Sequence, residues 1–196
     1  MKCLYCDKAI TKRSISSLIL GDDPLCLDCR SKLDFKRRKY KLDNLDVEYF
    51  YPYKGLFHSI LLQYKECGDE ALKEIFIYDL KEYIQFRYWN YSVCFVPSTE
   101  LKFKKRGFHP MKMIMNGVKI KEVEYVNIRE QLIQEGKTAR QRRDMENNFT
   151  YSGGKLDKVL IIDDVLTTGS TIRGVYNALK PHCRKIKVLV LALSEV

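Results

Sequence analysis

The stretch VLIIDDVLTTGSTI, residues 159–172, constrains the fold of this 196-residue chain more than any other feature. An apolar run ends there in two adjacent aspartates, and a short segment of threonine, glycine and serine follows. Carboxylates at the end of a buried run are costly to hold unless a cation or a hydrogen-bond donor meets them. The stretch therefore predicts a buried strand, a tight turn and a helix start, with a ligand beside the aspartates.

Apolar strands alternate with helical segments along most of the chain. A second apolar run, KIKVLVLAL at residues 185–193, follows a helical pattern at 170–181. Runs of this kind are typical of a parallel sheet covered on both faces, so the order predicts an α/β doubly wound parallel sheet. The other expected elements are strands at 47–53, 91–97, 122–128 and 158–163, helices at 55–66 and 68–86, a short helix within 107–118, and a long loop with a helical part at 129–150.

The segment after the aspartates is suited to an anion. Gly169 allows a tight turn, and the amides of the following helix start can point at a guest. Further donors are the hydroxyls of Thr167, Thr168, Ser170 and Thr171. Because Asp163 and Asp164 would repel a phosphate, we expect them to bind vicinal ribose hydroxyls, with Mg²⁺ relieving the remaining charge. A plain strand, turn and capped helix is the alternative, which explains the hydroxyls but not the paired aspartates.

Four apolar residues, two acids and TTGST resemble the 5-phosphoribosyl-1-pyrophosphate (PRPP) signature of type I phosphoribosyltransferases. The resemblance implies that Asp163 and Asp164 bind the ribose and Mg²⁺ of PRPP. It also implies a 5′-phosphate loop made of Val165, Leu166, Thr167, Thr168, Gly169, Ser170 and Thr171. A PRPP site needs a further contact region for the pyrophosphate, normally on the loop after an earlier strand of the sheet.

The segment VPSTELKFKKRGF, residues 96–108, fits this second region. We expect a pyrophosphate loop at Pro97, Ser98 and Thr99, where the preceding strand ends. Positive charge for a pyrophosphate or another polyanion comes from Lys102, Lys104, Lys105 and Arg106. An ordinary surface loop is the alternative interpretation.

Two C-x-x-C pairs at the N-terminus have the spacing of a metal site. Cys3 and Cys6 are separated from Cys26 and Cys29 by a gap that suits tetrahedral Zn²⁺ held by four thiolates. A redox C-x-x-C is the alternative for either pair alone. Since so short a segment cannot build much core, we expect structural zinc in a small N-terminal module. A basic bridge at 32–44 follows the module, and we divide the chain into residues 1–45 and 46–196.

The chain carries a formal net charge of +10, of which +6 falls on residues 101–150. A basic surface attracts nucleic acid, phosphorylated metabolites or anionic membranes, although a solvated, solubilising surface is the alternative. Its apolar runs are far shorter than the roughly 20 residues that span a bilayer. No secretory signal precedes them, so we expect a cytoplasmic protein without a membrane span and without disulfides.

A four-cysteine N-terminus joined to a phosphoribosyltransferase-like domain resembles the ComF (ComFC) competence family over nearly the whole length. The segments that carry the resemblance are the two C-x-x-C pairs and residues 53–69, 96–108, 140–149 and 159–172. At residues 106–110, RGFHP stands where the family usually has R-G-F-N-Q. The resemblance implies a cytoplasmic protein of natural transformation that binds PRPP and acts on incoming single-stranded DNA (ssDNA), together with other competence proteins such as a DNA-translocating helicase.

The sequence offers basic residues interleaved with aromatic ones for such a strand. The candidate DNA contacts are Lys102, Lys104, Lys105, Arg106, Arg142 and Arg143. Chance adjacency of aromatic and basic residues is the alternative. Two other functions also stay open: a working phosphoribosyltransferase of nucleotide or base metabolism, and a PRPP-sensing adaptor without chemistry.

Overall fold

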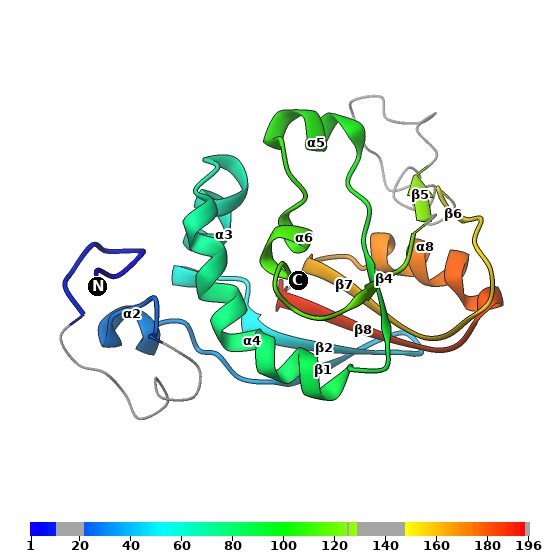
Figure 1. The fold of residues 1–196 in the computed structure, drawn as a ribbon, viewed down its shortest axis with the longest axis horizontal. Coiled ribbons are helices and arrows are strands. Elements are labelled where there is room, and N and C mark those ends of the chain that lie inside the picture. Colours follow the sequence, from blue (N-terminus) through cyan, green and yellow to red (C-terminus); the bar gives the residue numbers. More distant parts are fainter. Residues whose placement is uncertain (11–21, 125, 129–147, 195–196) are drawn as a thin grey trace.

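A six-stranded sheet forms the centre of the protein (Figure 1). The computed structural model describes residues 1–10, 22–124, 126–128 and 148–194. The strands lie in the order β1-β2-β8-β7-β3-β4, parallel except for the pair β1 and β2. Their bounds are β1 Arg38–Leu42, β2 Leu45–Pro52, β3 Ser92–Phe95, β4 Lys121–Glu122, β7 Leu156–Leu166 and β8 Cys183–Leu193. The predicted α/β fold with a mostly parallel sheet is confirmed.

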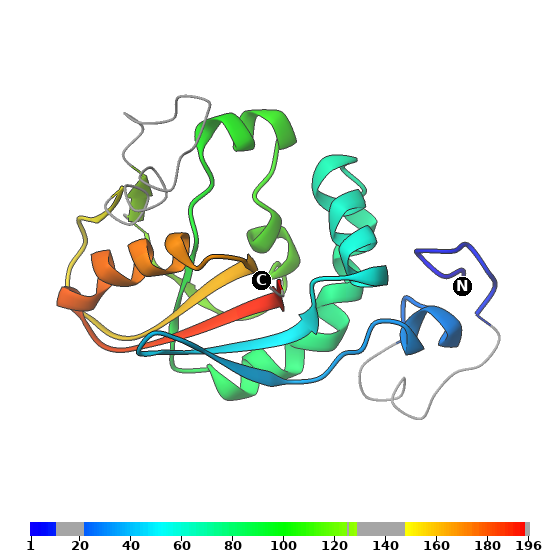
Figure 2. The ribbon, with the colours of Figure 1, turned by 180° about the vertical axis from the view of Figure 1, so that it is seen from behind.

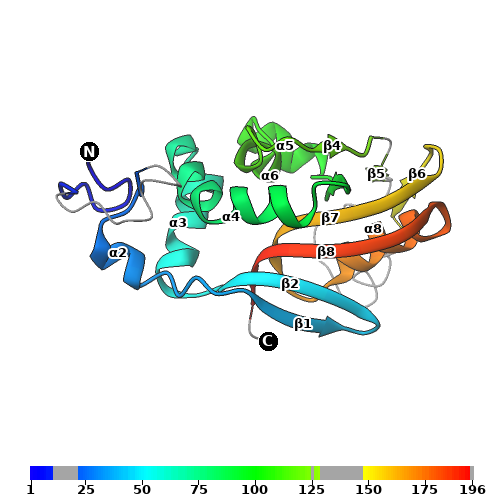
Figure 3. The ribbon, with the colours of Figure 1, turned by 60° about the horizontal axis from the view of Figure 1, so that its bottom comes forward.

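Helices cover the sheet on both faces (Figure 3). One face carries α3 (Gly55–Glu66), α4 (Lys73–Arg87) and α6 (Pro110–Ile114), and the other carries α8 (Ser170–Leu179). Alternate residues of the central strands explain this division, because successive side chains of a strand point to opposite faces. Leu160 and Ile162 join the cluster under α3 and α4, whereas Val159 and Ile161 join the cluster under α8. Two apolar layers therefore hold the sheet between them.

The remaining helical segments are short. They are α2 (Leu27–Ser31), η1 (Glu70–Leu72), α5 (Glu100–Arg106) and η4 (Lys180–His182). The helix expected at 68–86 is thus divided between η1 and α4, and η4 follows α8 directly. None of the helices that the structure describes is long and apolar enough to cross a bilayer.

Two expected elements differ from the structure. The single strand predicted at 122–128 is two strands, because the chain leaves the edge of the main sheet after β4. Its second part, β5 (Val126–Ile128), pairs antiparallel with β6 (Phe149–Tyr151) and packs against the cluster under α8. The segment predicted as a loop after β3 contains the helix α5. Most of the predicted loop at 129–150 lies outside the described residues, and its last residues are in β6.

The N-terminal cysteine module packs against α4 and the end of β2 (Figure 2). Leu25 and Leu33 are 2% and 1% exposed and belong to the same apolar cluster as the side chains of α3 and α4. Arg30 donates to both oxygens of Asp79 in α4, at 2.9 and 2.6 Å, and to both oxygens of Asp23. The basic bridge at 32–44 then contains β1, an edge strand of the main sheet. The division of the chain at residue 45 stays a prediction.

Candidate ligand and metal sites

The carboxyl ends of β7 and β3 lie side by side at one edge of the sheet, which we call the ligand edge. Strand β7 extends beyond the predicted bound of 163, so Asp163, Asp164, Val165 and Leu166 all lie within it. Val165 and Leu166 pair with Ala192 and Leu193 of β8. In Figure 1 the arrowheads of β7 and β8 point toward α3. This edge is where ligands of open α/β sheets bind.

A tight turn connects β7 to α8 at this edge. Thr167 and Thr168 are exposed, and Gly169 follows in the left-handed region with a φ of 78°. The hydroxyls of Thr168 and Ser170 lie 3.2 Å apart. Gly169 is the N-cap of α8 and brings no side-chain hydrogen bond to the first amides of the helix. Those amides, the helix dipole and the hydroxyls can therefore serve an anion such as a phosphate.

The β1–β2 hairpin packs against the turn. Arg173 of α8 donates from Nη1 to the Thr168 carbonyl oxygen at 2.8 Å and from Nε to Asp43 at 2.5 Å. Asp43 lies in the turn between β1 and β2, next to Leu42, which closes against Gly169. The hairpin thus fixes the conformation of the turn that bears the hydroxyls.

The two aspartates differ in their surroundings. Lys65 of α3 donates to Oδ2 of Asp164 at 2.6 Å, and these two side chains are 17% and 18% exposed. Asp163 is half-buried and accepts from the Asp164 backbone N–H at 2.9 Å. Burial, together with the neighbouring Asp164 carboxylate, raises the pKa of Asp163 to about 7. Lys65 and the two carboxyl groups thus lie together at the ligand edge, and the charge of Lys102 also acts on Asp163.

Lys65 is the site residue that the sequence analysis missed. Lys65 and Gly68 belong to the pattern of residues 53–69 that carries the family resemblance, but that pattern assigns Lys65 no role in the site. No local pattern brings it to Asp164, because the two residues lie 99 positions apart in the chain.

The residues predicted as a pyrophosphate loop follow β3 at the same edge. Pairing of Phe95 with Ile162 places Pro97, Ser98 and Thr99 next to the end of β7. Ser98 is half-buried. The Thr99 hydroxyl accepts from the Lys102 backbone N–H at 3.4 Å, so that Thr99 caps α5.

His109 lies beneath this segment. Its Nε2 is 3.1 Å from the carbonyl oxygen of Val96, and burial lowers the pKa of the imidazole. Its Nδ1 is buried and has no hydrogen-bond partner among the residues that the structure describes. We therefore describe it as a neutral side chain that supports the strand end.

The basic segment after β3 is a helix whose cations are partly neutralised. Lys105 and Arg106 pair with Glu66 of α3 at 2.9 and 2.6 Å, and these two partners lower the pKa of Glu66 to about 2. Lys104 pairs with Glu100 at 3.1 Å. Within the described ranges, Lys102 forms no ion pair. The other two candidate DNA contacts, Arg142 and Arg143, lie outside those ranges.

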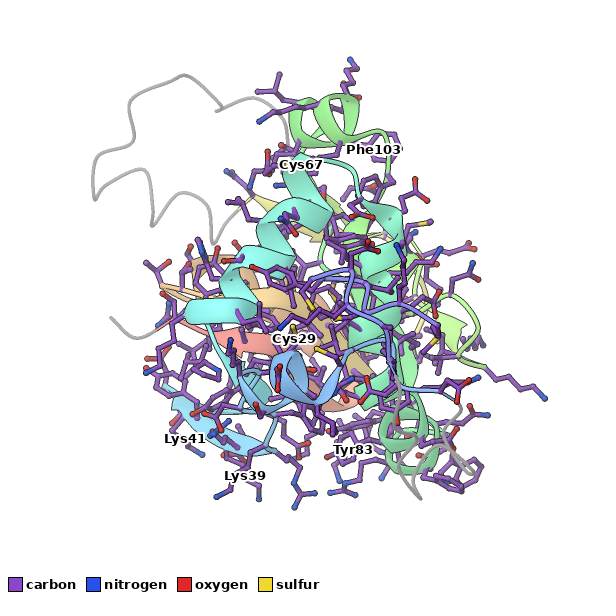
Figure 4. All side chains as sticks on the ribbon, turned by 90° about the vertical axis from the view of Figure 1, so that its left-hand side faces the viewer. Cys29, Lys39, Lys41, Cys67, Tyr83 and Phe103 are labelled. Atoms are coloured by element: carbon purple, nitrogen blue, oxygen red, sulfur yellow. The ribbon has the colours of Figure 1, made fainter. Side chains whose placement is uncertain are left out.

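Helix α5 also exposes apolar side chains. Leu101 and Phe103 are 71% and 49% exposed. Figure 4 shows Phe103 and Cys67 at one end of the molecule and the basic residues Lys39 and Lys41 of β1 at the other. Basic residues thus occur at both ends of the molecule, and the described candidate DNA contacts lie at the end that bears α5.

The four N-terminal cysteines form a cluster that can hold a metal ion. The Sγ atoms of Cys3, Cys6, Cys26 and Cys29 all lie within 4.8 Å of one another. A tetrahedral zinc with Zn–S bonds of about 2.3 Å needs sulfurs roughly 3.8 Å apart. Cys6 and Cys26 are 3.6 Å apart. The donor set and its spacing therefore fit zinc.

Local backbone geometry brings these sulfurs together. The backbone carbonyl oxygen of Cys3 accepts from the Asp7 amide at 3.0 Å, and Asp7 adopts a φ of 60°. Together they close the turn that carries Cys3 and Cys6. Cys26 and Cys29 lie at the start of α2 and within it, where the Arg30 amide donates to the backbone carbonyl oxygen of Cys26 at 2.9 Å. Burial opposes ionisation of the Cys3 thiol, but backbone donors outweigh it and lower its pKa to about 7. A thiolate there is the form that binds metal.

The other cysteines of the described residues lie apart from this cluster. Cys67 is exposed at the end of α3 and Cys94 is buried in β3. Burial raises the pKa of Cys94 to about 12, so this thiol stays protonated.

Comparison with known proteins adds a relative of nearly equal length. No family model matches the chain. The competence protein ComFC of Streptococcus pneumoniae (strain ATCC BAA-255 / R6) is 26% identical to it over 207 residues, which cover 92% of this chain and 94% of that protein. The match confirms the resemblance to the ComF/ComFC family that the motifs predict.

Proposed function

With the resemblance to the ComF/ComFC family as the premise, we propose that this chain acts in natural transformation as a cytoplasmic protein that binds PRPP with Mg²⁺ and handles incoming ssDNA. The observation that carries the proposal is the composition of the ligand edge. Asp163 and Asp164 meet a turn of small hydroxylated residues and the start of α8 at a single strand end. A phosphorylated sugar offers a phosphate to the turn and hydroxyl groups to the aspartates.

Each part of the edge has a chemical counterpart in PRPP. The amides of α8 and the hydroxyls of Thr167 and Thr168 suit the 5′-phosphate. The carboxylates suit the ribose hydroxyls as acceptors. Mg²⁺, when bound with PRPP, would supply positive charge between the carboxylates and the pyrophosphate. Ser98, after β3, would meet the pyrophosphate from the neighbouring strand end.

Calorimetric titration of variants tests the PRPP site. Asp163→Asn and Asp164→Asn keep the side-chain volume but remove the charge, and we expect each to weaken binding of PRPP with Mg²⁺ at least tenfold. Asp157→Asn is the matched control, because Asp157 lies at the opposite end of the same strand, where it pairs with Arg184. Equal affinity in all three variants would refute the assignment of the aspartates.

For ssDNA we propose contacts on α5. The basic residues of this helix differ in their exposure and in the acidic residues that hold them. Lys104 is 76% exposed, whereas Arg106 is 15% exposed and held by Glu66. Phe103 lies on the same helix and offers a face on which a base can stack. Lys102 and Lys104 are therefore the cations best placed to meet phosphates beside a stacked base.

Salt dependence separates these cations. A single-strand contact contributes about 0.7 to the slope of log affinity against log salt. We expect Lys102→Gln with Lys104→Gln to lower this slope by about 1.4, and Arg106→Gln to leave it unchanged. An unchanged slope in the double variant would remove α5 from the DNA surface.

The zinc assigned to the N-terminal cluster has a structural role in this proposal. Four thiolates close the coordination sphere of a tetrahedral ion and leave no position for a substrate. The module instead holds Arg30 against Asp79, and so helps to set the position of α4 on its face of the sheet.

A further inference from the structure

The ion pair between Lys65 and Asp164 lies inside the ligand edge and joins two distant parts of the chain. Its atoms are 2.6 Å apart, and both side chains are more than four-fifths buried. Burying an ion pair costs desolvation energy that is recovered only when the geometry is good and further hydrogen bonds complete it.

The buried ion pair between Arg30 and Asp79 has more donors to its carboxylate than the pair at the ligand edge. Both carboxylate oxygens of Asp79 accept from Nη1 of Arg30, and one of them also accepts from the Tyr51 hydroxyl. Asp164 receives the single ammonium of Lys65, and a second carboxyl group, Asp163, lies next to it. Asp79 thus has an arginine and a hydroxyl as donors, whereas Asp164 has one lysine donor and a neighbouring carboxyl group, with the charge of Lys102 acting on Asp163 from further away.

The last turn of α3 is anchored so that Lys65 faces this edge. The Tyr64 hydroxyl donates to the Pro110 carbonyl oxygen in α6 at 2.9 Å. Glu66 holds Lys105 and Arg106 at the end of α5. Residues on both sides of Lys65 are therefore fixed to the segment that follows the predicted pyrophosphate loop.

Lysine is suited to a change of partner. Its ammonium is a compact charge with three donors on a flexible four-carbon stem, and it binds phosphate groups as readily as carboxylates. A bound phosphoribosyl ligand would bring anionic groups and sugar hydroxyls to the same edge. The hydroxyls need Asp164 as an acceptor, and the anionic groups need a cation.

We propose that Lys65 is a ligand-binding residue of this edge, whose ammonium holds Asp164 in the free protein and passes to the pyrophosphate of the bound ligand. The exchange frees Asp164 to accept from the ribose hydroxyls. The proposal rests on the proposed function, which it deepens by naming the group that distinguishes PRPP from ribose 5-phosphate. Ribose 5-phosphate needs the same release of Asp164 but offers Lys65 no pyrophosphate.

Two ligands on one variant test this exchange. Lys65→Gln keeps a donor for Asp164 but removes the charge. We expect it to weaken PRPP binding about 10- to 100-fold, which corresponds to the loss of a charge-assisted hydrogen bond. Binding of ribose 5-phosphate should be unchanged or tighter, because Asp164 is released more easily. Lys65→Arg should restore part of the PRPP affinity, and Lys81→Gln, an exposed change on α4, should affect neither ligand.

A second measurement uses the wild-type chain and does not depend on the folding of a variant. Acetylation by a small amine-reactive reagent, located by mass spectrometry, reports how accessible the Lys65 amine is. We expect ribose 5-phosphate to increase the reactivity of Lys65 and PRPP with Mg²⁺ to keep it low.

The outcomes separate this inference from the proposed function. Wild type that binds neither ligand would refute the proposed function itself. Wild type that binds PRPP, with the same ratio of the two affinities in Lys65→Gln or equal Lys65 reactivity with both ligands, would overturn the role of Lys65 and leave the PRPP site in place.

Discussion

Substitution of Gly169, the N-cap of α8, tests how closely the β1–β2 hairpin packs against the turn at the ligand edge. Gly169 has a φ of 78°, and a Cβ atom at this position would lie 2.7 Å from both Cδ atoms of Leu42. Gly107 has the same φ of 78°, but no atom of the described chain lies within 4 Å of its Cβ position. The two glycines share a backbone conformation and differ in one steric contact.

The expected losses in the free energy of unfolding follow from the backbone conformation and from the steric contact. Alanine in the left-handed region costs about 1 to 2 kcal/mol, and the stiffer unfolded chain offsets about 0.4 to 1 kcal/mol. Gly107→Ala should therefore lower the free energy of unfolding by about 1 kcal/mol. At Gly169 the new methyl group also meets Leu42, which is 5% exposed and cannot move into solvent. Since overpacking costs about 1 to 3 kcal/mol, we expect Gly169→Ala to lose about 2 to 4 kcal/mol.

Urea unfolding of four variants measures the contact directly. A double-mutant cycle joins Gly169→Ala with Leu42→Ala, and Gly107→Ala serves as the conformational control. Removing the Leu42 side chain leaves space for the methyl group, so Gly169→Ala should then cost about 1 kcal/mol, as at Gly107. Equal losses at the two glycines, or no coupling between residues 42 and 169, would refute the packing of the hairpin against the turn.

Three further predictions concern the module and the aspartates. Arg30→Ala should lower the free energy of unfolding by about 3 kcal/mol in urea melts, because it leaves Asp79, with a side chain 7% exposed, without its cation. Cys3→Ser should abolish zinc binding, measured as metal content by mass spectrometry, whereas Cys67→Ser should retain it; full zinc content in Cys3→Ser would point to other ligands. Because the pKa of Asp163 is raised from 3.8 to about 7, the free energy of unfolding should fall as pH rises between these two values and level off above about 7. Asp163→Asn should remove that decline in urea melts between about pH 4 and about pH 7, and an unchanged decline would contradict the raised pKa of this carboxyl group.

Local signals in the sequence account for the elements that were predicted well. The predicted helix at 55–66 has the same bounds as α3, since Phe57, Ile60, Leu61 and Tyr64 are buried at helical spacing. Such a stripe defines a helix without knowledge of its partner. The central strands were predicted for a similar reason, because near-continuous apolar runs fit only a sheet covered on both faces.

The elements that were predicted wrongly depend on shorter or more distant signals. Helix α5 lies between the N-cap Thr99 and the C-cap Gly107, and both signals are present in the sequence, but the basic run between them has no apolar stripe. The break between β4 and β5 has another cause. The partner of β5 is β6, more than twenty positions away, and alternation of side chains cannot tell which sheet a strand joins.

The sequence also predicts the part of the candidate site that is local in the chain. The motif at 159–172 marks the aspartates and the turn, because strand, acids and hydroxyls follow one another in the chain. Lys65 was not predicted as a site residue, since its place opposite Asp164 depends on how α3 packs across the sheet. The neutralisation of Lys105 and Arg106 by Glu66 depends on the same packing.

Calorimetric titration of the zinc-replete chain with PRPP and Mg²⁺, with and without an unspecific single-stranded oligonucleotide, tests the central claim most directly. We predict saturable binding of one PRPP per chain, with an affinity that changes when the oligonucleotide is present, because two ligands of one protein that favour different states are linked. Absence of binding under both conditions would contradict the assignment of the ligand edge to PRPP.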